Sequence, residues 1–379
     1  MAELSENIIS KERIVSIDAL RGFDMFWIIG AAKLASVLFT LKDTSWGARI
    51  ALEFDHTAWN GFTFYDLIFP LFLLIAGLAI PFSLSKYQKG GKVFKNGYIY
   101  AHIRIITRTM ILIFLGFLVN GFLNFDFANM RWPGVLQRIA ICYLVAAIIV
   151  LNTPSRWRPL TVGIIFAVIL IGYWLIMRFV PVPGGTAGNL SPEGNLAGYI
   201  DRLVIPGKFC CYSSGDNEGL LSTIPAIATI LMGVLTGFLL KINKSKSLIA
   251  LYIFISGIVS LILGIAWNFI FPVNKILWTS SYVLFSGGLS LLLFALFYWI
   301  IDVKGHKKWA FFFVVIGMNA IVVYVVTAIV DFGIFVGILT DGFAKYMGIF
   351  RVPFLLICLL GIKWLFLYFL YKKKIFLKA

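Results

Sequence analysis

The sequence has little charge and few of the side chains that most enzymes use for chemistry. Only 13% of its 379 residues are charged, and it contains three histidines and four cysteines. No GxGxxG turn followed by a strand, Walker loop, HExxH or CxxC pair occurs, which removes support from dinucleotide, ATP and zinc chemistry. Cys142, Cys210, Cys211 and Cys358 match neither a metal-ligand spacing nor a disulfide framework. We therefore expect no metal, and the sequence assigns no role to adjacent Cys210 and Cys211.

Apolar residues dominate instead. They make up 60% of the chain, with 36 Phe and a mean hydropathy of +0.94. Long apolar runs predict helices, because a helix satisfies its own backbone hydrogen bonds in hydrocarbon and about 20 residues cross a core of roughly 30 Å. We predict an all-α, polytopic integral membrane protein of about ten transmembrane helices. The predicted spans are 14–40, 64–85, 103–123, 133–151, 160–179, 220–240, 248–270, 278–301, 309–331 and 351–371.

The placement of the basic residues predicts topology rather than a nucleic-acid partner. The formal net charge is +16. If the N-terminus lies in the cytoplasm, most Lys and Arg lie on cytoplasmic segments, such as 86–95 and 372–378. The positive-inside rule then puts both termini in the cytoplasm. We expect one transmembrane domain over residues 1–379. The long outer connections 41–63 and 180–219 are expected to contribute to its functional site.

One histidine lies in a setting suited to catalysis. His56 is part of EFDHTAWNGFTFYD, just before the second predicted span. Histidine exchanges protons near neutrality, so His56 could take a proton from an attacking ammonium or hydroxyl, or form a transient acyl-imidazole. An ordinary interfacial histidine is the alternative. His102 and His306 lie in basic cytoplasmic loops, where we expect solvated side chains.

The first predicted span carries three ionisable residues. Asp18, Arg21 and Asp24 follow one another at spacings of three in SIDALRGFDMFW, and therefore lie along one flank of a helix. Ionisable residues this close to hydrocarbon normally face the protein interior and pair. They either build a polar site in which Arg21 holds a phosphate or a carbonyl, or form a structural Asp and Arg pair.

Polar residues of several further segments share a depth near the outer ends of the spans. Arg138 of RWPGVLQRIAICY lies too deep for a surface charge, and Asp66, Asp216 and Glu218 are its candidate partners. We predict a polar pocket open to the periplasm and suited to a hydroxyl-rich ligand. Its expected residues are His56, Asn60, Asp66, Gln137, Arg138, Asp216, Glu218, Asn274, Lys275 and Ser281, with Trp59 or Trp278 stacking on a sugar face. Interfacial anchoring is the alternative for each of them.

Two further groups lie elsewhere along the chain. The basic residues before and within the third predicted span are Lys86, Lys89, Lys92, Lys95, Arg104 and Arg108. Topology and contacts with anionic lipids account for most of them, and a minority could receive the nucleotide end of an anionic donor. Gly317, Met318 and Asn319 lie near the middle of the ninth predicted span.

Seven ordered segments resemble the heparan-alpha-glucosaminide N-acetyltransferase family and its bacterial relatives, from the first to the ninth predicted span. They are SIDALRGFDMFW, HTAWNGFTFYDLIFPLFLLIAG, PGVLQRIAICY, DNEGLLSTIPAIATILMGVLTG, FPVNKILWTSSY, IIDVKG and GMNAIVVYV. The resemblance implies acetyl-coenzyme A on the cytoplasmic side, and a terminal glucosamine amine on the far side as acceptor. It also implies that the histidine of the HxxWNG segment, His56, is the central catalytic residue.

From this resemblance we expect an acetyl-coenzyme A-dependent N-acetyltransferase of the bacterial inner membrane. His56 is expected to act as general base or acetyl carrier, and Asp66 and Asn60 to orient the imidazole or the sugar. The residues expected at acetyl-coenzyme A are Asp18, Arg21, Gln137, Arg138 and Asn319, with Arg21 and Arg138 balancing phosphate or oxyanion charge. Those expected at the acceptor are Trp59, Asp216, Glu218, Asn274, Lys275, Trp278 and Ser281.

The expected partners are an amino sugar or glucosaminide and the membrane lipids, with no nucleic acid, and the Phe-rich helix faces permit a homodimer. Two other functions stay open. Bacterial relatives are often labelled as amino-sugar transport proteins, which predicts sugar uptake without acetyl-coenzyme A. O-acetylation of an envelope polysaccharide is the other alternative, since a pocket for a sugar amine also admits a sugar hydroxyl.

Overall fold

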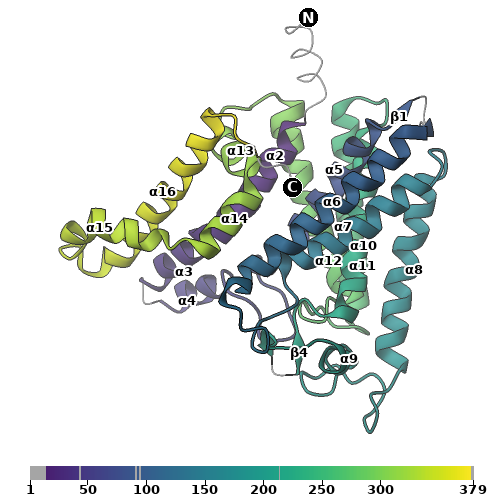
Figure 1. The fold of residues 1–379 in the computed structure, drawn as a ribbon, viewed down its shortest axis with the longest axis horizontal. Helices are drawn as coiled ribbons and strands as arrows, with labels where there is room; N and C mark the ends of the chain where they lie inside the picture. The colour runs from purple at the N-terminus through teal and green to yellow at the C-terminus, as the bar shows by residue number, and fades with distance from the viewer. Residues whose placement is uncertain (1–13, 42–43, 90–91, 94, 213, 377–379) are drawn as a thin grey trace, which may run out of the picture.

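The computed structural model describes residues 14–41, 44–89, 92–93, 95–212 and 214–376, and within them it is almost wholly helical (Figure 1). The helices are α2 Val15–Phe26, η1 Trp27–Ala31, α3 Ala32–Thr40, α4 Ser45–Leu52, η2 Phe64–Leu67, α5 Ile68–Ser85, α6 Lys95–Val119, η3 Phe122–Asn124, α7 Val135–Asn152, α8 Arg158–Phe179, α9 Leu196–Val204, α10 Leu220–Leu240, α11 Lys246–Asn268, α12 Ser280–Tyr298, η4 Trp299–Val303, α13 Phe311–Met318, α14 Ala320–Ile329, α15 Phe332–Ala344, η5 Gly348–Phe350 and α16 Arg351–Lys372. Two antiparallel hairpins pair β1 Gln88–Lys89 with β2 Lys92–Val93, and β3 Cys211–Tyr212 with β4 Gly215–Asp216.

The predicted all-α, polytopic membrane architecture is confirmed. Nine helical stretches of the described residues are long and apolar enough to cross a membrane, and a tenth results if the bent pair α13–α14 is counted as one span. The predicted and observed bounds agree within a few residues for most spans, and the sixth, Leu220–Leu240, matches at both ends. Apolar run length fixes these bounds, because each run must cover the same hydrocarbon thickness.

The ninth predicted span, 309–331, is the main departure from a straight helix. It is divided at Asn319 into α13 and α14, whose axes differ by 67°. Asn319 has non-helical backbone angles, φ −129° and ψ 34°, which end one helix and begin the next. The chain then forms the short apolar helix α15, which lies between the predicted spans 309–331 and 351–371 and was not predicted. The two hairpins were likewise not predicted.

The first span is also interrupted, at Gly30. Its start is capped by Asp302, whose carboxylate accepts the backbone N–H groups of Val15 and Ser16 at 3.2 and 3.0 Å. A π-helical turn, η1, follows and contains Gly30, whose φ of 142° suits glycine alone. Lys363 from α16 donates to the carbonyl of Ile29 at 2.7 Å, which satisfies a backbone group that the break exposes.

Glycines set the closest helix contacts. A Cβ placed on Gly77 of α5 would lie 2.1 Å from the carbonyl oxygen of Ile230 in α10, and one on Gly233 of α10 would lie 2.1 Å from that of Leu74. In lipid, helix association depends on such close packing between small residues, because apolar side chains gain little by leaving apolar solvent. These contacts hold α5 and α10 at the centre of the fold.

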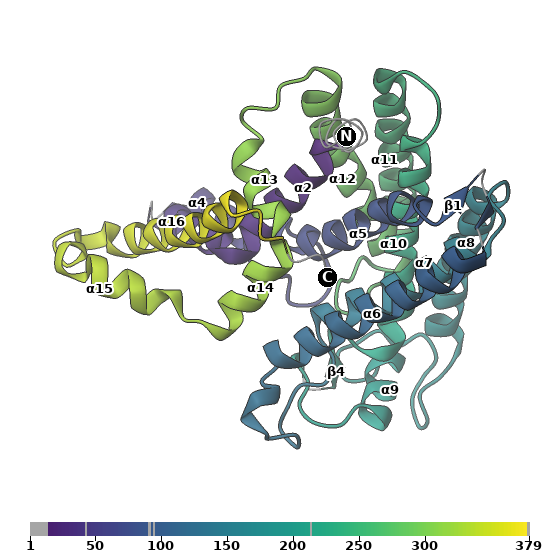
Figure 2. The same ribbon diagram turned by 45° about the horizontal axis from the view of Figure 1, so that its top comes forward.

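The helices form two groups that meet at α2 and α13 (Figures 1 and 2). Helices α5 to α8 and α10 to α12 make the larger group, while α3, α14, α15 and α16 lie to the other side. Helices α4 and α9 and the β3–β4 hairpin gather at one end, opposite the β1–β2 hairpin (Figure 1). The two connections predicted to carry function, 41–63 and 180–219, therefore come to the same end of the molecule.

Candidate functional site

The site centres on the imidazole of His56. Its Nδ1 lies 2.8 Å from Asp66 Oδ1 and 2.8 Å from Lys275 Nζ, and Lys275 Nζ lies 3.1 Å from the same carboxylate oxygen. The ring of Tyr65 lies alongside, with ring centroids 4.7 Å apart. The His56 side chain is 48% exposed, whereas that of Asp66 is fully buried. The protein thus holds the imidazole most closely through Nδ1, with Lys275 Nζ also 3.4 Å from Nε2, and leaves much of the ring accessible to a ligand.

Asp66 is fixed by the local fold before it meets His56. Thr63 and Asp66 form a capping box at the start of η2, in which the Asp66 carboxylate accepts the backbone N–H of Thr63. Asp66 Oδ2 also accepts the hydroxyls of Thr57 and Thr63 at 2.9 and 3.1 Å. Oδ1 is left for His56 and Lys275, so the two carboxylate oxygens have separate partners. A carboxylate held in this way orients an imidazole through Nδ1.

Lys275 comes from a different part of the chain, the connection between α11 and α12. The backbone N–H of Gly61 donates to the carbonyl of Val273 at 2.9 Å, and Asn274 Nδ2 donates to Asn60 Oδ1 at 3.1 Å. These two bonds join the Lys275 segment to the loop that carries His56. Burial lowers the pKa of Lys275, and although Asp66 acts in the opposite direction, burial prevails.

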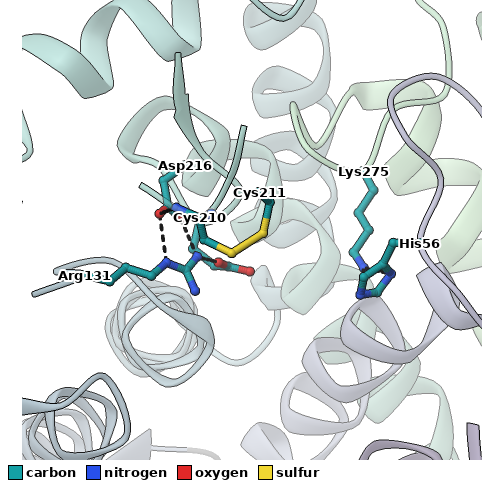
Figure 3. The surroundings of a disulfide bond; sticks show 7 residues. His56, Arg131, Cys210, Cys211, Asp216 and Lys275 are labelled. Carbon is teal, nitrogen blue, oxygen red and sulfur yellow. Dashed lines mark hydrogen bonds and ion pairs between the residues drawn. A yellow bond between two sulfur atoms is a disulfide. The ribbon is translucent and has the colours of Figure 1, made fainter. Parts of the chain in front are cut away.

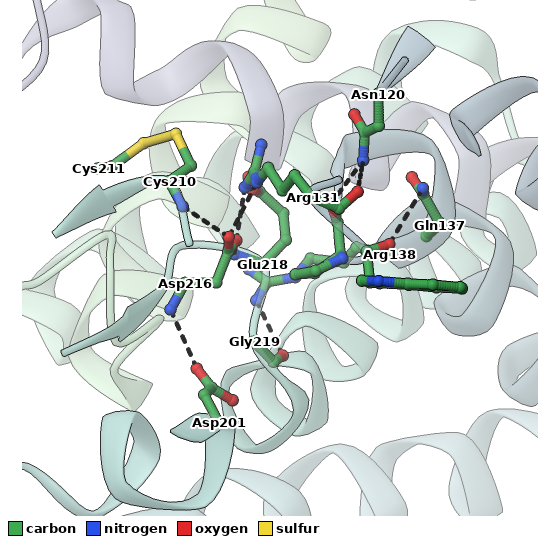
Figure 4. Close-up of polar contacts among 12 residues, drawn as sticks. Asn120, Arg131, Gln137, Arg138, Asp201, Cys210, Cys211, Asp216, Glu218 and Gly219 are labelled. Carbon is green, nitrogen blue, oxygen red and sulfur yellow. Dashed lines mark hydrogen bonds and ion pairs between the residues drawn. A yellow bond between two sulfur atoms is a disulfide. The ribbon is translucent and has the colours of Figure 1, made fainter. Parts of the chain in front are cut away.

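A second charged cluster lies nearby (Figure 4). Arg131 Nε and Nη2 donate to the two carboxylate oxygens of Asp216 at 2.8 and 2.5 Å, and Nη2 also contacts Glu218. Burial raises the pKa of Asp216, but Arg131 outweighs it and holds that pKa below its usual value. Asn120 fixes the approach to α7 by donating to the carbonyls of Arg131 and Pro133.

Cys210 and Cys211 form a disulfide beside this cluster. We predicted no role for this adjacent pair, because neighbouring cysteines rarely bond to each other. The local backbone explains the pairing, since Cys211 adopts a positive φ of 79° where the chain turns into β3. The backbone N–H of Cys210 donates to Asp216 at 2.9 Å, which ties the disulfide to the Arg131 cluster.

These groups surround a cavity of about 260 Å³ (Figure 3). One end is polar, and is lined by His56, Tyr65, Arg131, Cys210, Cys211, Asn217, Glu218 and Lys275. The rest is apolar, and is lined by Met25, Ile28, Ile68, Phe69, Phe72, Val135, Leu136, Ile139, Ile321 and Tyr324. The cavity therefore leads from the exposed imidazole to the interior of α2, α5, α7 and α14.

Comparison with known proteins supports the resemblance seen in the sequence. Residues 13–192 match the family model described as "Heparan-alpha-glucosaminide N-acetyltransferase, catalytic". The chain is also 29% identical over 371 residues to the heparan-alpha-glucosaminide N-acetyltransferase of Homo sapiens, covering 83% of this chain and 52% of that protein. The Mus musculus protein of the same name is 29% identical over 376 residues, with coverage of 83% and 53%. These matches support the assignment of the chain to the heparan-alpha-glucosaminide N-acetyltransferase family. It spans about half the length of these two relatives.

The match to the heparan-alpha-glucosaminide N-acetyltransferase model covers only part of the site. His56, Asp66 and Arg131 lie within residues 13–192. The Cys210–Cys211 disulfide and Lys275 follow residue 192 in the chain. The site is therefore assembled from the segment that the family model describes and from later connections that close over it.

The structure changes the predicted pairing of Arg138. Asp216 and Glu218 pair with Arg131, and Asp66 pairs with His56 and Lys275, so none of the three predicted carboxylates is left for Arg138. Arg138 instead donates to Ser222 Oγ and to the carbonyl of Gly219. The reason is geometric, because Arg131 precedes α7 and reaches the hairpin, while Arg138 is buried in the first turn of the helix.

Several other predicted residues lie behind the cavity wall rather than on it. Trp278 is fully buried and donates to Thr229 Oγ1, so it offers no surface for a sugar. Gln137 is buried and donates to the carbonyl of Trp132, and Ser281 shares a hydrogen bond with Thr279. Trp59 donates to the carbonyl of Leu190 and packs edge-on against Tyr212. These side chains shape the loops of the site without lining its cavity.

The residues predicted at acetyl-coenzyme A do not converge. Arg21 pairs with Asp18 at 3.7 Å along α2, which agrees with the predicted flank. Asp24 on the same flank is fully buried, and neither carboxylate oxygen has a hydrogen-bond partner among the described residues. Asn319, at the α13–α14 break, donates to the carbonyl of Ile375. Asp18, Arg21, Gln137, Arg138 and Asn319, the five residues predicted at acetyl-coenzyme A, are not among the residues that line the cavity at His56, and neither is Asp24.

A second cavity, of about 530 Å³, lies where α5, α6 and α7 meet near the β1–β2 hairpin. Its polar side chains include Tyr87, Arg104 and Arg108, and the Arg108 guanidinium lies over the ring of Tyr143 at 4.4 Å. Tyr143 is one turn along α7 from Ile139, which lines the first cavity, so both residues share a face of that helix. The two cavities therefore follow one side of α7 in succession.

Sequence reasoning missed Tyr65, Arg131, Asn217 and the disulfide. Tyr65 and Arg131 carried a signal, because they lie within segments already chosen, EFDHTAWNGFTFYD and RWPGVLQRIAICY. Asn217 lies between two predicted residues, Asp216 and Glu218. The disulfide carried no signal in the sequence, because a bond between adjacent cysteines depends on a backbone conformation that composition does not reveal.

Proposed function

We propose that this protein is a membrane acetyltransferase, which transfers the acetyl group of acetyl-coenzyme A to the amine of a glucosamine-type sugar. The transfer takes place at the end of the molecule that carries His56, which the positive-inside rule puts on the periplasmic side of a bacterial inner membrane. The observation that carries the proposal is the His56, Asp66 and Lys275 cluster at the polar end of a cavity that continues into the membrane region.

The cluster suits acyl transfer in its hydrogen bonding. When His56 Nδ1–H donates to Asp66, Nε2 carries a lone pair and can take the proton of an attacking ammonium or accept the acetyl group itself. Lys275 and Arg131 are the cations that line the same cavity, where charge develops on the thioester oxygen. The leaving thiolate takes up a proton to give free coenzyme A.

The charge of the second cluster suits an amino-sugar acceptor. Asp216 and Glu218 share the single guanidinium of Arg131, which leaves one negative charge on the cluster. Glu218 lines the cavity, so a ligand ammonium there would gain a partner. A neutral sugar hydroxyl would gain less, which favours N-acetylation over O-acetylation.

The second cavity supports donor entry from the opposite end. Arg104 and Arg108 can pair with the phosphates of an anionic donor, and Tyr87 and Tyr143 offer ring surfaces beside them. The pantetheine arm would then follow the shared face of α7 towards Ile139 and the first cavity. Along α5, Phe72 lines the first cavity and Ser83 the second, a separation of roughly 16 Å at 1.5 Å per residue.

The disulfide gives independent support for the sidedness. Structural disulfides persist in oxidising compartments and are rare in the cytosol. A Cys210–Cys211 bond is therefore expected on a non-cytoplasmic face, which is also where the distribution of Lys and Arg puts this end.

The test is turnover by the purified protein in lipid nanodiscs. With acetyl-coenzyme A and glucosamine, we expect free coenzyme A and N-acetylglucosamine in equal amounts, measured by mass spectrometry. His56→Ala should abolish both products while keeping the wild-type melting temperature, and His306→Ala serves as the matched control. Absence of product with any amino sugar would falsify the proposal.

Two further measurements separate the remaining alternatives. Exchange of label between acetyl-coenzyme A and coenzyme A without acceptor indicates that His56 carries the acetyl group, and its absence indicates direct transfer. Uptake of labelled glucosamine by proteoliposomes that lack acetyl-coenzyme A would instead identify a transporter. Release of acetate from the product by mild alkali would identify an ester, and therefore O-acetylation.

A further inference from the structure

The Cys210–Cys211 disulfide faces the His56 and Lys275 pair across the polar end of the cavity (Figure 3). Both cysteines line this cavity, together with Arg131 and Glu218. The reaction outlined above uses the imidazole, the carboxylates and the cations, and it leaves the two sulfur atoms without a role.

Stabilisation of the chain does not explain this bond. A disulfide stabilises a fold chiefly by closing a loop of the unfolded chain, and the gain falls as the loop shortens. Cys210 and Cys211 are neighbours, so their bond closes no loop between distant segments. The hairpin is instead held by other contacts, among them Arg202 Nη1 to the carbonyl of Ser214 at 2.6 Å and Asp216 to Arg131.

The position of the disulfide is nevertheless fixed with respect to the site. The N–H of Cys210 donates to Asp216 Oδ2, and Cys211 pairs with Asp216 across the β3–β4 hairpin. Tyr212, the next residue, packs edge-on against Trp59 with ring centroids 5.2 Å apart. Trp59 belongs to the loop that carries His56, so the disulfide and the imidazole are held by contacting segments.

What the disulfide adds is an apolar, polarisable surface where the other side chains are charged or polar. Its sulfur atoms carry no proton to donate, and sulfur makes favourable contacts with apolar and ring surfaces. A pyranose ring has an apolar face of C–H groups and polar substituents around its edge. A ring that lies on the disulfide can therefore present its amino group to the carboxylate of Glu218.

We propose that the Cys210–Cys211 disulfide is the platform on which the ring face of the acceptor amino sugar lies, with Glu218 beside its ammonium and the amine directed towards His56. This inference rests on the proposed function and specifies its acceptor subsite. The donor is not expected to depend on the disulfide, because the apolar remainder of the cavity, lined by residues such as Phe69 and Ile139, is where its arm approaches.

The platform is sensitive to reduction. A dithiol reductant transfers two electrons and two protons to the pair, which gives two separate thiols and the cyclic disulfide of the reductant. The flat double-sulfur surface is then lost, while the Arg131 and Asp216 contacts that hold the hairpin remain. Acceptor affinity should fall, and donor affinity should not.

The experiment compares the wild type with the double variant Cys210→Ser/Cys211→Ser in nanodiscs. Glucosamine binding is measured by calorimetry without acetyl-coenzyme A, and KM is then measured for each substrate. We expect the Kd and KM for glucosamine to rise by about three- to tenfold, the scale of a sulfur contact with a ring surface. The KM for acetyl-coenzyme A and the melting temperature should stay at their wild-type values. Treatment with dithiol should reproduce the change in the wild type and leave the double variant unaffected.

The outcomes separate this inference from the proposed function, because binding is measured without turnover. Wild-type protein that binds glucosamine through the disulfide but forms no product supports the platform and refutes the acetyltransferase. Equal glucosamine affinity in the wild type and the double variant overturns the platform, whatever the turnover. A double variant with a lower melting temperature and a raised KM for both substrates also overturns it, since the bond would then be structural only.

Discussion

Replacing Asp66 by Asn tests how the imidazole is held. Asp66 Oδ2 accepts the N–H groups of Thr57 and Thr63 and both of their hydroxyls, whereas Oδ1 accepts from His56 and Lys275. An Asn side chain has one oxygen, and the fixed N–H donors require it at the Oδ2 position. Its NH₂ group then replaces Oδ1 and points at His56 Nδ1.

An amide donor at that position selects the wrong tautomer. His56 Nδ1 must then act as the acceptor, so Nε2 carries the proton and cannot take one from the attacking amine. We expect kcat to fall by roughly 10³- to 10⁴-fold, the range seen when the carboxylate of a histidine-based catalytic unit is replaced by its amide. The free energy of unfolding should fall by about 1 to 3 kcal/mol, because Lys275 loses a charged partner while the capping box survives.

The assay is single-turnover formation of N-acetylglucosamine in nanodiscs, alongside thermal unfolding. Asp126→Asn is the matched control, since Asp126 is exposed and its hydrogen bonds within the described part of the chain are to Asn129 in its own turn. A kcat for Asp66→Asn equal to that of Asp126→Asn would refute the orienting role of the carboxylate. A complete loss of folded protein would instead locate the effect in the capping box, and Thr63→Ala should then have the same consequence.

Four other perturbations have outcomes that follow from the structure. Arg131→Gln leaves Asp216 with little compensation for its buried charge and should lower the free energy of unfolding by roughly 3 kcal/mol, read from thermal unfolding. Burial lowers the pKa of Lys275 in the folded state. Between that lowered pKa and the unfolded value of about 10.4, the unfolded chain therefore binds more protons at Lys275 than the folded chain does. The free energy of unfolding of the wild type, relative to that of Lys275→Met, should rise with pH across this window. Gly77→Ala should cost about 1 to 3 kcal/mol, because its Cβ would lie 2.1 Å from a carbonyl oxygen of α10. Gly163→Ala, whose new Cβ meets nothing within 4 Å beyond its chain neighbours and its own helix backbone, should instead stabilise its helix by up to about 1 kcal/mol.

The membrane spans could be predicted from the sequence because one physical requirement governs them. Each apolar run must cover the hydrocarbon, and its ends are marked by charged or polar residues. The breaks at Gly30 and Asn319 have no such signal, because they depend on what the neighbouring helix supplies. At Gly30 the neighbour is Lys363, more than 300 positions later in the chain, which donates to the carbonyl that the break exposes.

The site was predictable in part for a related reason. Polar residues at one membrane depth had to meet, since few partners exist in a chain with so little charge. Depth does not determine which of these residues pair. Asp216 and Glu218 were therefore predicted to pair with Arg138, which follows their actual partner, Arg131, by seven positions in the chain. Only the path of the β3–β4 hairpin decides between these two arginines.

The scarcity of charge also explains how the protein could sort two ligands of opposite sign. At the His56 end, Asp66 and Lys275 balance each other, while Asp216 and Glu218 exceed Arg131 by one negative charge. At the other end, the second cavity contains Arg104 and Arg108. An ammonium is attracted to the first cluster, and the phosphates of coenzyme A are repelled by it and attracted to the arginines. Because apolar helices lie between the two ends, salt ions screen this difference in charge only weakly. Under the proposed function, the donor would therefore have one favourable orientation in the molecule, with its phosphates at the arginines and its uncharged thioester at the imidazole.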